Sequence, residues 1–276
     1  MSLVEGLLLF ILGFAVSLPA SMAGLGGGFI MVPILIVLFG LPPEKAVAIS
    51  LMAMCGTSIS ATIGYMRQKR IDYLLGLVYD ILDIPGVIIG AYLTTILPPD
   101  LLTGTVGILI ICVAVLLFTR DKKDFPVEDE KPRFFRKGWE RKKVDSAGTM
   151  FKYVISNPGL VLLSSFAGGL VSGMCGLGGG ITDTSTMILL GVPPHIAVAS
   201  SEFAMTLTSL TGTFAHEFLN NLLIDYATPI TIGTIIGAQV GSSLAKRVKG
   251  KTLRKILSII GILAGIRLIS AYIFKF

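Results

Sequence analysis

Ten apolar segments, divided by one charged insert, dominate the 276-residue chain. Segments of 20 or so residues match a hydrocarbon core of roughly 30 Å, because a helix rises about 1.5 Å per residue. Continuously apolar segments exclude a transmembrane β-barrel, whose strands alternate apolar and polar residues. We therefore predict an all-α polytopic membrane protein. The segments fall at about 3–23, 28–40, 44–66, 72–96, 101–119, 159–175, 180–191, 196–219, 225–245 and 252–274.

Charged residues are few and unevenly placed. They make up 14% of the chain, against roughly 25% in soluble proteins, and 18 of the 40 lie within 120–158. This composition excludes soluble enzymes and secreted disulfide scaffolds. The net charge of +6 needs no nucleic acid, since basic loops orient membrane helices. The three cysteines and two histidines form no disulfide or metal motif, so we expect no metal and no cofactor.

The two halves of the chain repeat each other. The glycine run Gly24–Gly28 recurs as Gly176–Gly180. Four more motifs recur in the same order at a spacing of about 150 residues: Gly-x-Pro-Pro, Ala-Val-Ala-x-Ser, Ile-Asp-Tyr and Ile-Ile-Gly-Ala. Five matches in one order indicate an internal duplication. We expect a first repeat at 1–119, a charged linker at 120–158 and a second repeat at 159–276.

The basic residues orient the two repeats in opposite directions. The loop at 67–70 carries three basic residues, whereas its counterpart at 216–223 carries no Lys or Arg. The next pair reverses the comparison, because 97–100 is not basic and its counterpart at 246–255 is rich in Lys and Arg. By the positive-inside rule the repeats are inverted. The linker is then cytoplasmic, and both termini are external.

The second apolar segment of each repeat, at 28–40 and 180–191, is short and follows the glycine run. Each segment either crosses the membrane as one of five spans or forms a re-entrant hairpin with the run at its tip. We favour a broken pair of segments that meet inside the membrane, because 12 apolar residues are too few for an ordinary span.

These motifs resemble the TauE/SafE family of sulfite and organosulfonate exporters. The resemblance rests on the glycine runs, the Gly-x-Pro-Pro turns, the Ala-Val-Ala-x-Ser helix starts and the later Gly-Ala segments, and it covers nearly all of the chain outside 120–158. It implies a permease of the cell membrane that moves small sulfur-containing anions, often outward. One departure is that Phe29–Ile34 is apolar, whereas Ile181–Thr186 carries hydroxyls and a carboxylate. The chemistry of the two repeats is therefore unequal.

The glycine runs are the first candidate for a substrate site. A helix N-terminus leaves about four N–H groups unpaired and carries partial positive charge, so it binds an anion without a basic side chain. The alternative is close packing of helices, a common use of small residues in membranes. Two runs at equivalent positions favour the site. The candidate glycines are Gly26, Gly27, Gly28, Gly178, Gly179 and Gly180.

Hydroxyl groups that follow the runs are the second candidate. A hydroxyl can donate to an oxyanion, although in apolar helices it often bonds a backbone carbonyl of its own helix. One arginine, Arg267, lies within an apolar segment. It is a further candidate, as a partner for the substrate or for an acid. The candidates are Ser50, Thr57, Ser58, Thr182, Ser200, Ser201, Thr208, Ser209 and Arg267.

Glu202 and Asp183 are the candidate proton-coupling residues. Each lies within an apolar segment, where a charge costs about 3 kcal/mol or more. An ionised carboxylate repels a nearby anion, whereas a protonated one donates a hydrogen bond to it, so proton coupling reconciles the acids with an anion. Glu202 comes first because it follows the serine pair. Asp80 and Asp83 have either a direct role or a structural pairing with Arg267.

The linker has two interpretations. Trp139 among basic residues is typical of an amphipathic stretch on anionic lipid. The mixed charge and the two prolines favour a solvated linker instead.

The sequence thus predicts a secondary transporter for a small anion such as sulfite, a sulfonate or a related sulfur oxyanion, with protons and membrane lipids as partners. A cation- or proton-driven transporter of another small solute is the alternative. A membrane-embedded enzyme comes third, since the chain has no catalytic or nucleotide-binding motif.

Overall fold

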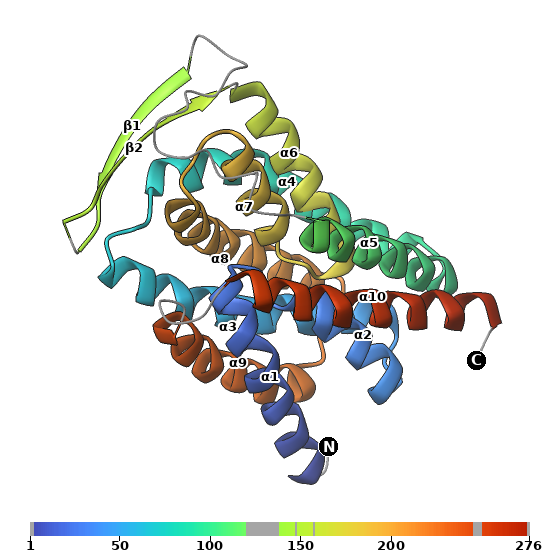
Figure 1. Cartoon of the computed structure of the whole chain (residues 1–276). Helices are drawn as coiled ribbons and strands as arrows, with labels where there is room; N and C mark the ends of the chain where they lie inside the picture. The colour runs from blue at the N-terminus through green and yellow to red at the C-terminus, as the bar shows by residue number, and fades with distance from the viewer. Residues whose placement is uncertain (1–2, 120–137, 147, 157, 245–249, 275–276) are drawn as a thin grey trace.

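Helices make up nearly all of the computed structural model, which describes residues 3–119, 138–146, 148–156, 158–244 and 250–274 (Figure 1). The helices of the first half are α1 (Leu3–Ala23), α2 (Gly28–Phe39), α3 (Pro43–Arg67), α4 (Tyr73–Ile96) and α5 (Pro99–Thr119). A hairpin of two strands follows, β1 (Gly138–Val144) and β2 (Met150–Ser156). The helices of the second half are α6 (Pro158–Cys175), α7 (Gly180–Leu189), α8 (Pro194–Phe218), α9 (Ile224–Leu244) and α10 (Gly250–Phe274).

The repeated motifs mark the helix boundaries. Helices α3 and α8 begin at the second proline of Gly-x-Pro-Pro, Pro43 and Pro194, where the missing N–H group costs nothing. Helix α2 ends at Gly40, whose φ of +61° is the left-handed conformation that terminates many helices. Helix α4 is capped by Asp72, whose carboxylate accepts the Leu75 N–H at 3.3 Å.

Helices α2 and α7 are the shortest in the described chain. They have 12 and 10 residues and so span about 18 and 15 Å at the usual helical rise, roughly half of a hydrocarbon core. They begin at Gly28 and Gly180, directly after the glycine runs, as the sequence predicts. The start of α2 is fully buried, with Phe29 and Val32 inaccessible to solvent.

Each main helix–helix interface joins the first half to the second. Helix α1 packs along α9, α4 along α6, α3 against α8 and α5 against α10. Glycines allow the close approach: a Cβ on Gly13 would clash with the Ile230 carbonyl, and a Cβ on Gly169 would clash with the Asp83 carbonyl. The α1–α9 and α4–α6 interfaces thus each bring a glycine of one helix against a backbone carbonyl of the other.

Helix α4 places polar residues inside and apolar residues outside. Asp80 and Asp83 are buried within the bundle, whereas Ile81, Ile88 and Tyr92 are exposed. This arrangement is the reverse of a soluble protein's and suits lipid surroundings. Four helices in the described chain are long and apolar enough to cross a membrane, at Leu3–Met22, Pro43–Arg67, Tyr73–Ile96 and Lys255–Ile273.

The hairpin is a departure from an all-α fold. Strands β1 and β2 pair antiparallel, with Arg141 opposite Tyr153. They lie beside the starts of α4 and α6, at the end of the bundle away from the N-terminus (Figure 1). The expectation of a solvated linker does not hold for Tyr153 and Ile155, which are buried against the helices, whereas Trp139, Lys142 and Met150 are exposed. The earlier part of the linker, 120–137, lies outside the described residues.

Candidate functional site

The two glycine runs meet around a pair of methionines, Met54 of α3 and Met205 of α8. A Cβ on Gly26 would lie 2.7 Å from Met205 Sδ, and one on Gly178 would lie 3.1 Å from the same atom and closer still to Met54 Cε. Both methionines are buried. The runs also touch directly, since a Cβ on Gly28 would clash with the carbonyl of Gly176. The candidate glycines of both halves are therefore gathered in one place.

The backbone of the runs requires glycine. Gly27 and Gly179, which precede α2 and α7, have φ values of +92° and +71°, in the left-handed region that other residues rarely adopt. Neither has a side-chain cap within the described residues. Two helix N-terminal ends, each with partial positive charge, thus start within the buried centre of the bundle.

The surroundings of the two runs differ. A Cβ on Gly27 would meet Val16 at 2.9 Å and Ala20 at 3.1 Å. A Cβ on Gly179 would meet carboxylate oxygens of Asp83 and Asp183, each at 3.1 Å. The α2 N-terminus therefore has an apolar flank, whereas the α7 N-terminus faces two acids.

Three acids gather beside the second run. The Thr208 hydroxyl donates to Asp80 Oδ1 at 3.1 Å and lies within hydrogen-bond distance of Asp83 Oδ2. Asp183 is fully buried, and neither of its carboxylate oxygens has a hydrogen-bond partner in the described chain. Sequence analysis proposed Thr208 as a substrate ligand, but the structure places its hydroxyl on these acids.

The serines at the helix starts bind the glycine runs. Ser50 Oγ donates to the Gly176 carbonyl at 2.9 Å, and Ser201 Oγ donates to the Gly180 carbonyl at 3.2 Å. Ser200 Oγ instead accepts the backbone N–H of Asp72 at 2.8 Å. Ser50 and Ser201 thus hold the backbone of the glycine runs, and Ser200 holds the backbone of Asp72. All three hydroxyls are engaged by protein groups.

The remaining hydroxyls bond carbonyls of their own segments, the alternative that the sequence left open. Thr57 donates to Ala53 O at 3.1 Å and Thr182 to Gly179 O at 2.6 Å. Ser209 donates to Met205 O at 2.6 Å, and Ser58 donates to Cys55 O at 3.2 Å. The Ser58 and Ser209 hydroxyls also lie 3.5 Å apart, so α3 and α8 touch there.

Glu202 is buried on a different face of α8 from the acids beside the second run. Residues 201 and 208 are seven apart and share a face, whereas Glu202 lies roughly 100° around the helix. It is inaccessible to solvent, and neither carboxylate oxygen has a hydrogen-bond partner in the described residues. The structure therefore separates Glu202 from Asp183.

Arg267 is not brought to the site. It is exposed on α10, where its guanidinium lies 3.5 Å from the Ser270 hydroxyl of the next turn. Asp80 and Asp83 contact Thr208 instead. The predicted pairing of Arg267 with these acids or with substrate has no contact to support it.

The comparisons with known proteins now decide the family. The family model of the sulfite exporter TauE/SafE matches residues 9–268. The chain belongs to this family. The probable membrane transporter protein YunE of Bacillus subtilis (strain 168) is 31% identical, over 97% of this chain and 98% of the relative. The sulfite exporter TauE/SafE family protein 3 of Arabidopsis thaliana is 24% identical, over 95% of this chain and 76% of the relative. No solved structure matches.

Membership of the TauE/SafE family confirms the resemblance drawn from the glycine runs. The family and the names of the relatives identify a multi-pass membrane transporter. Sequence reasoning missed two features of this family member, the methionine pair and the contact of Asp83 with the second run. A signal for the pair was present, because Met54 and Met205 each stand four residues after the repeated serine, Ser50 or Ser201.

Proposed function

We propose that the protein is a proton-coupled secondary transporter of a small anion such as sulfite, a sulfonate or a related sulfur oxyanion. The observation that carries this proposal is the meeting of two buried helix N-termini, those of α2 and α7, around one methionine pair. The names of the family and of its Arabidopsis thaliana member, which both contain the words sulfite exporter, support the class of anion.

The anion binds at the N-terminus of α2 in this proposal. Free N–H groups and the helix dipole attract an anion without a cation nearby. The flank that Val16 and Ala20 supply carries no charge, so nothing in this flank repels an anion. Glycine at Gly27 lets the backbone come close to the bound oxygen atoms.

The proton binds at the N-terminus of α7. Asp83 and Asp183 both face Gly179, and a buried carboxylate without a partner is stable only when it is neutral or paired with a cation. When protonated, Asp183 can donate a hydrogen bond toward an anion at the meeting point of the runs. When ionised, it repels the anion, so release of the proton and release of the anion are linked. Glu202, buried apart from the runs, is a second protonation site.

Inverted repeats are part of this proposal. The reversal of loop charge between the halves supports them, as does the exchange of the α1–α9 contact for the α6–α4 contact. The linker is then cytoplasmic and both termini are external. The position of the N-terminus at the end of the bundle away from the hairpin fits this orientation (Figure 1).

One observation favours a second candidate function. Asp80, Asp83 and Asp183 are buried carboxylates, and acids buried within a membrane also serve transporters of another solute that are driven by a cation. Proteoliposome transport separates the two candidates. We expect efflux of sulfite or a short alkylsulfonate to follow an imposed pH gradient and to ignore a sodium gradient. Sodium-driven transport at constant pH would favour the second candidate, and absence of sulfite and sulfonate transport under either gradient would overturn the first.

A further inference from the structure

The two faces of the hairpin have different roles. Strand alternation places Arg141 and Lys143 of β1 on the same face as Tyr153 and Ile155 of β2, given that Arg141 pairs with Tyr153. This inner face contacts the helix bundle, with Tyr153 and Ile155 in one apolar cluster with residues of α4, α7 and α8. Lys142 lies on the outer face and is exposed.

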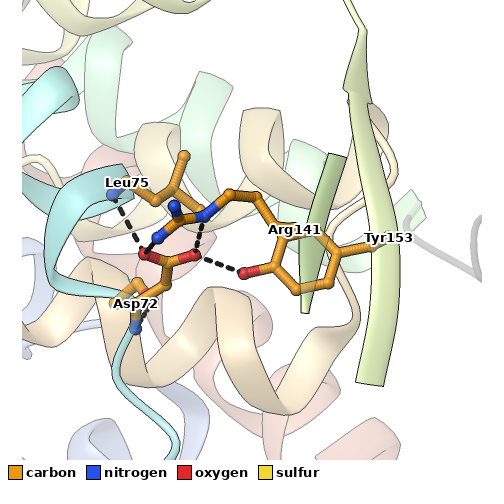
Figure 2. A network of polar contacts seen from close by, with 5 residues as sticks. Asp72, Leu75, Arg141 and Tyr153 are labelled. Carbon is orange, nitrogen blue, oxygen red and sulfur yellow. Dashed lines mark hydrogen bonds and ion pairs between the residues drawn. The ribbon is translucent and has the colours of Figure 1, made fainter. Parts of the chain in front are cut away.

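The inner face is attached to the bundle through Asp72, the N-terminal cap of α4. Figure 2 shows Arg141 and Tyr153 converging on the Asp72 carboxylate from the hairpin, while the Leu75 N–H approaches from α4. Arg141 Nε and Nη2 donate to Oδ2 and Oδ1 at 2.9 and 2.5 Å, and the Tyr153 hydroxyl donates to Oδ2 at 2.6 Å. Paired charge-assisted hydrogen bonds of this kind are among the strongest in proteins.

Asp72 is also joined to the second glycine run. Its backbone N–H donates to Ser200 Oγ of α8 at 2.8 Å. The next residue, Ser201, donates to the carbonyl of Gly180 at 3.2 Å. A continuous series of contacts therefore runs from the hairpin through Asp72 and the start of α8 to the start of α7.

A second attachment holds the turn of the hairpin. Asp145 pairs with Arg70 at 3.1 Å, and the Ser146 N–H donates to the Gln68 carbonyl at 3.0 Å. Both contacts fix the hairpin to the loop between α3 and α4. Ala197 at the start of α8 is fully buried in the apolar cluster that also holds Tyr153.

Within the described residues, the equivalent position of the other half has no such cover. The Ile-Asp-Tyr motif recurs at the start of α9, but Asp225 is exposed there, whereas Asp72 is only 2% exposed. The attachment is thus a one-sided addition to a repeated framework.

We propose that the hairpin is a latch on the second half, with Asp72 as the positioning residue that transmits its state to Ser200 and the second glycine run. When docked, the hairpin holds the starts of α4 and α8 together and covers Ala197. When released, it lets these helix ends move and exposes Ala197. The proposal goes beyond the transport function and is independent of the solute carried.

Thiol labelling of the full-length protein in nanodiscs tests the latch without any substrate. Ala197→Cys, in a Cys112→Ser background, is treated with a membrane-impermeant maleimide. We expect Arg141→Ala to raise the labelling rate about tenfold or more, since each charge-assisted bond lost contributes appreciably to docking. Tyr153→Phe should raise the rate less. The matched control is Lys142→Ala, which removes a hairpin charge that does not contact Asp72 and should leave the rate unchanged.

Charge exchange separates positioning from general damage to the fold. Arg141→Asp with Asp72→Arg should restore slow labelling, whereas either change alone should not. Equal labelling of the parent, Arg141→Ala and Tyr153→Phe proteins would overturn the latch. An increase of the labelling rate by Lys142→Ala equal to that caused by Arg141→Ala would also overturn it. If Arg141→Ala fails to fold, the labelling rates of Tyr153→Phe and of the charge-exchanged protein test the latch in its place.

A reversible crosslink tests whether release is needed for transport. The hydrogen bond from Ser146 to Gln68 brings the two backbones close enough for a disulfide. The double variant Gln68→Cys with Ser146→Cys should lose transport on oxidation and regain it on reduction. Transport by each single variant should be unchanged by either treatment. Full transport by the oxidised double variant would contradict release of the latch. Absence of transport even when reduced would count against the transport proposal alone, since the labelling result stands apart from it.

Discussion

The two glycine runs have the same backbone conformation but different chemical environments. In each run a glycine in the left-handed conformation, Gly27 or Gly179, directly precedes a short buried helix. Next to Gly27 lie Val16 and Ala20, whereas next to Gly179 lie Asp83 and Asp183. Repetition therefore supplies two similar helix N-termini, and a few side chains make them unequal.

The difference lies in side chains outside the repeated motifs. Asp183 is three residues beyond Gly180, and the equivalent position after the first run is Met31. Asp83 belongs to α4, whereas Val16 and Ala20 belong to α1. A duplicated transporter can thus keep one N-terminus for the anion and use the other for the ion that drives it. The predictions that follow start from this division.

The largest effect should come from the glycines themselves. Gly27→Ala and Gly179→Ala should each reduce transport to about a hundredth or less, because a left-handed side-chain-bearing residue costs roughly 1–2 kcal/mol and its Cβ occupies the site. Proteoliposome flux measures this. Gly40→Ala is the control: its φ is also positive at +61°, but nothing lies within 4 Å of an added Cβ.

The control separates strain from position. If Gly40→Ala loses transport as severely, backbone strain explains all three variants. If Gly27→Ala and Gly179→Ala both transport fully, the site is not at the runs. Size-exclusion chromatography of each variant establishes that the membrane protein is folded before flux is compared.

Asp183→Asn should have the next largest effect and should show that the two runs have different roles. An amide keeps a hydrogen-bond donor but cannot take up a proton, so we expect binding within about threefold of the parent and loss of the pH dependence of flux. Flux measured between pH 5 and 8 tests this. Met31→Leu, at the matching position of the first run, should keep the parental pH profile. An unchanged profile in Asp183→Asn would remove this residue from coupling.

Glu202→Gln should have a smaller effect than Asp183→Asn, because Glu202 lies on another face of α8. If it is a second protonation site, the variant retains substrate binding and shows a weaker pH dependence. The counterpart in the first half is Leu51, so Leu51→Ile serves as the control. A profile identical to the parent's in Glu202→Gln would exclude it from coupling.

The smallest effect should be that of pH on the hairpin. Burial by itself raises the pKa of Asp72, but hydrogen bonds from Arg141, Tyr153 and the Leu75 N–H outweigh it and hold the pKa below its usual value. The stabilisation by this ion pair is present above the unfolded pKa of about 4 and is lost only as pH falls through the lower folded value. Labelling of Ala197→Cys, normalised to a free thiol, should therefore be constant between pH 5 and 8. A rise at pH 5 would show that Asp72 is not the controlling acid.

Much of the fold follows from sequence because its signals are local. The apolar segments, the Pro43 and Pro194 helix starts and the glycine runs before α2 and α7 all act within a few residues. The hairpin could not be foreseen in the same way. Arg141 and Lys143 appear solvated in a charged insert, and only tertiary contacts with Asp72 and Tyr73 give them partners.

The candidate site was predictable in its backbone but not in its side-chain contacts. Repetition pointed to the glycines, which the structure gathers around the methionine pair. It did not reveal that Ser50 and Ser201 are engaged by backbone carbonyls, or that Arg267 points away. Those outcomes depend on helix rotation and on contacts across about 130 residues of sequence, which periodicity does not encode.

Proton uptake on anion binding tests the unequal roles of the runs most directly. A short alkylsulfonate, which does not itself titrate near neutral pH, is added to the purified protein in weakly buffered solution with a pH indicator. At a pH high enough to ionise Asp183 in the unliganded protein, we predict uptake of up to about one proton per bound anion in the parent protein and in Met31→Leu. Asp183→Asn should bind the anion with no uptake. Uptake by Asp183→Asn equal to that of the parent would contradict the assignment of the proton to the second run.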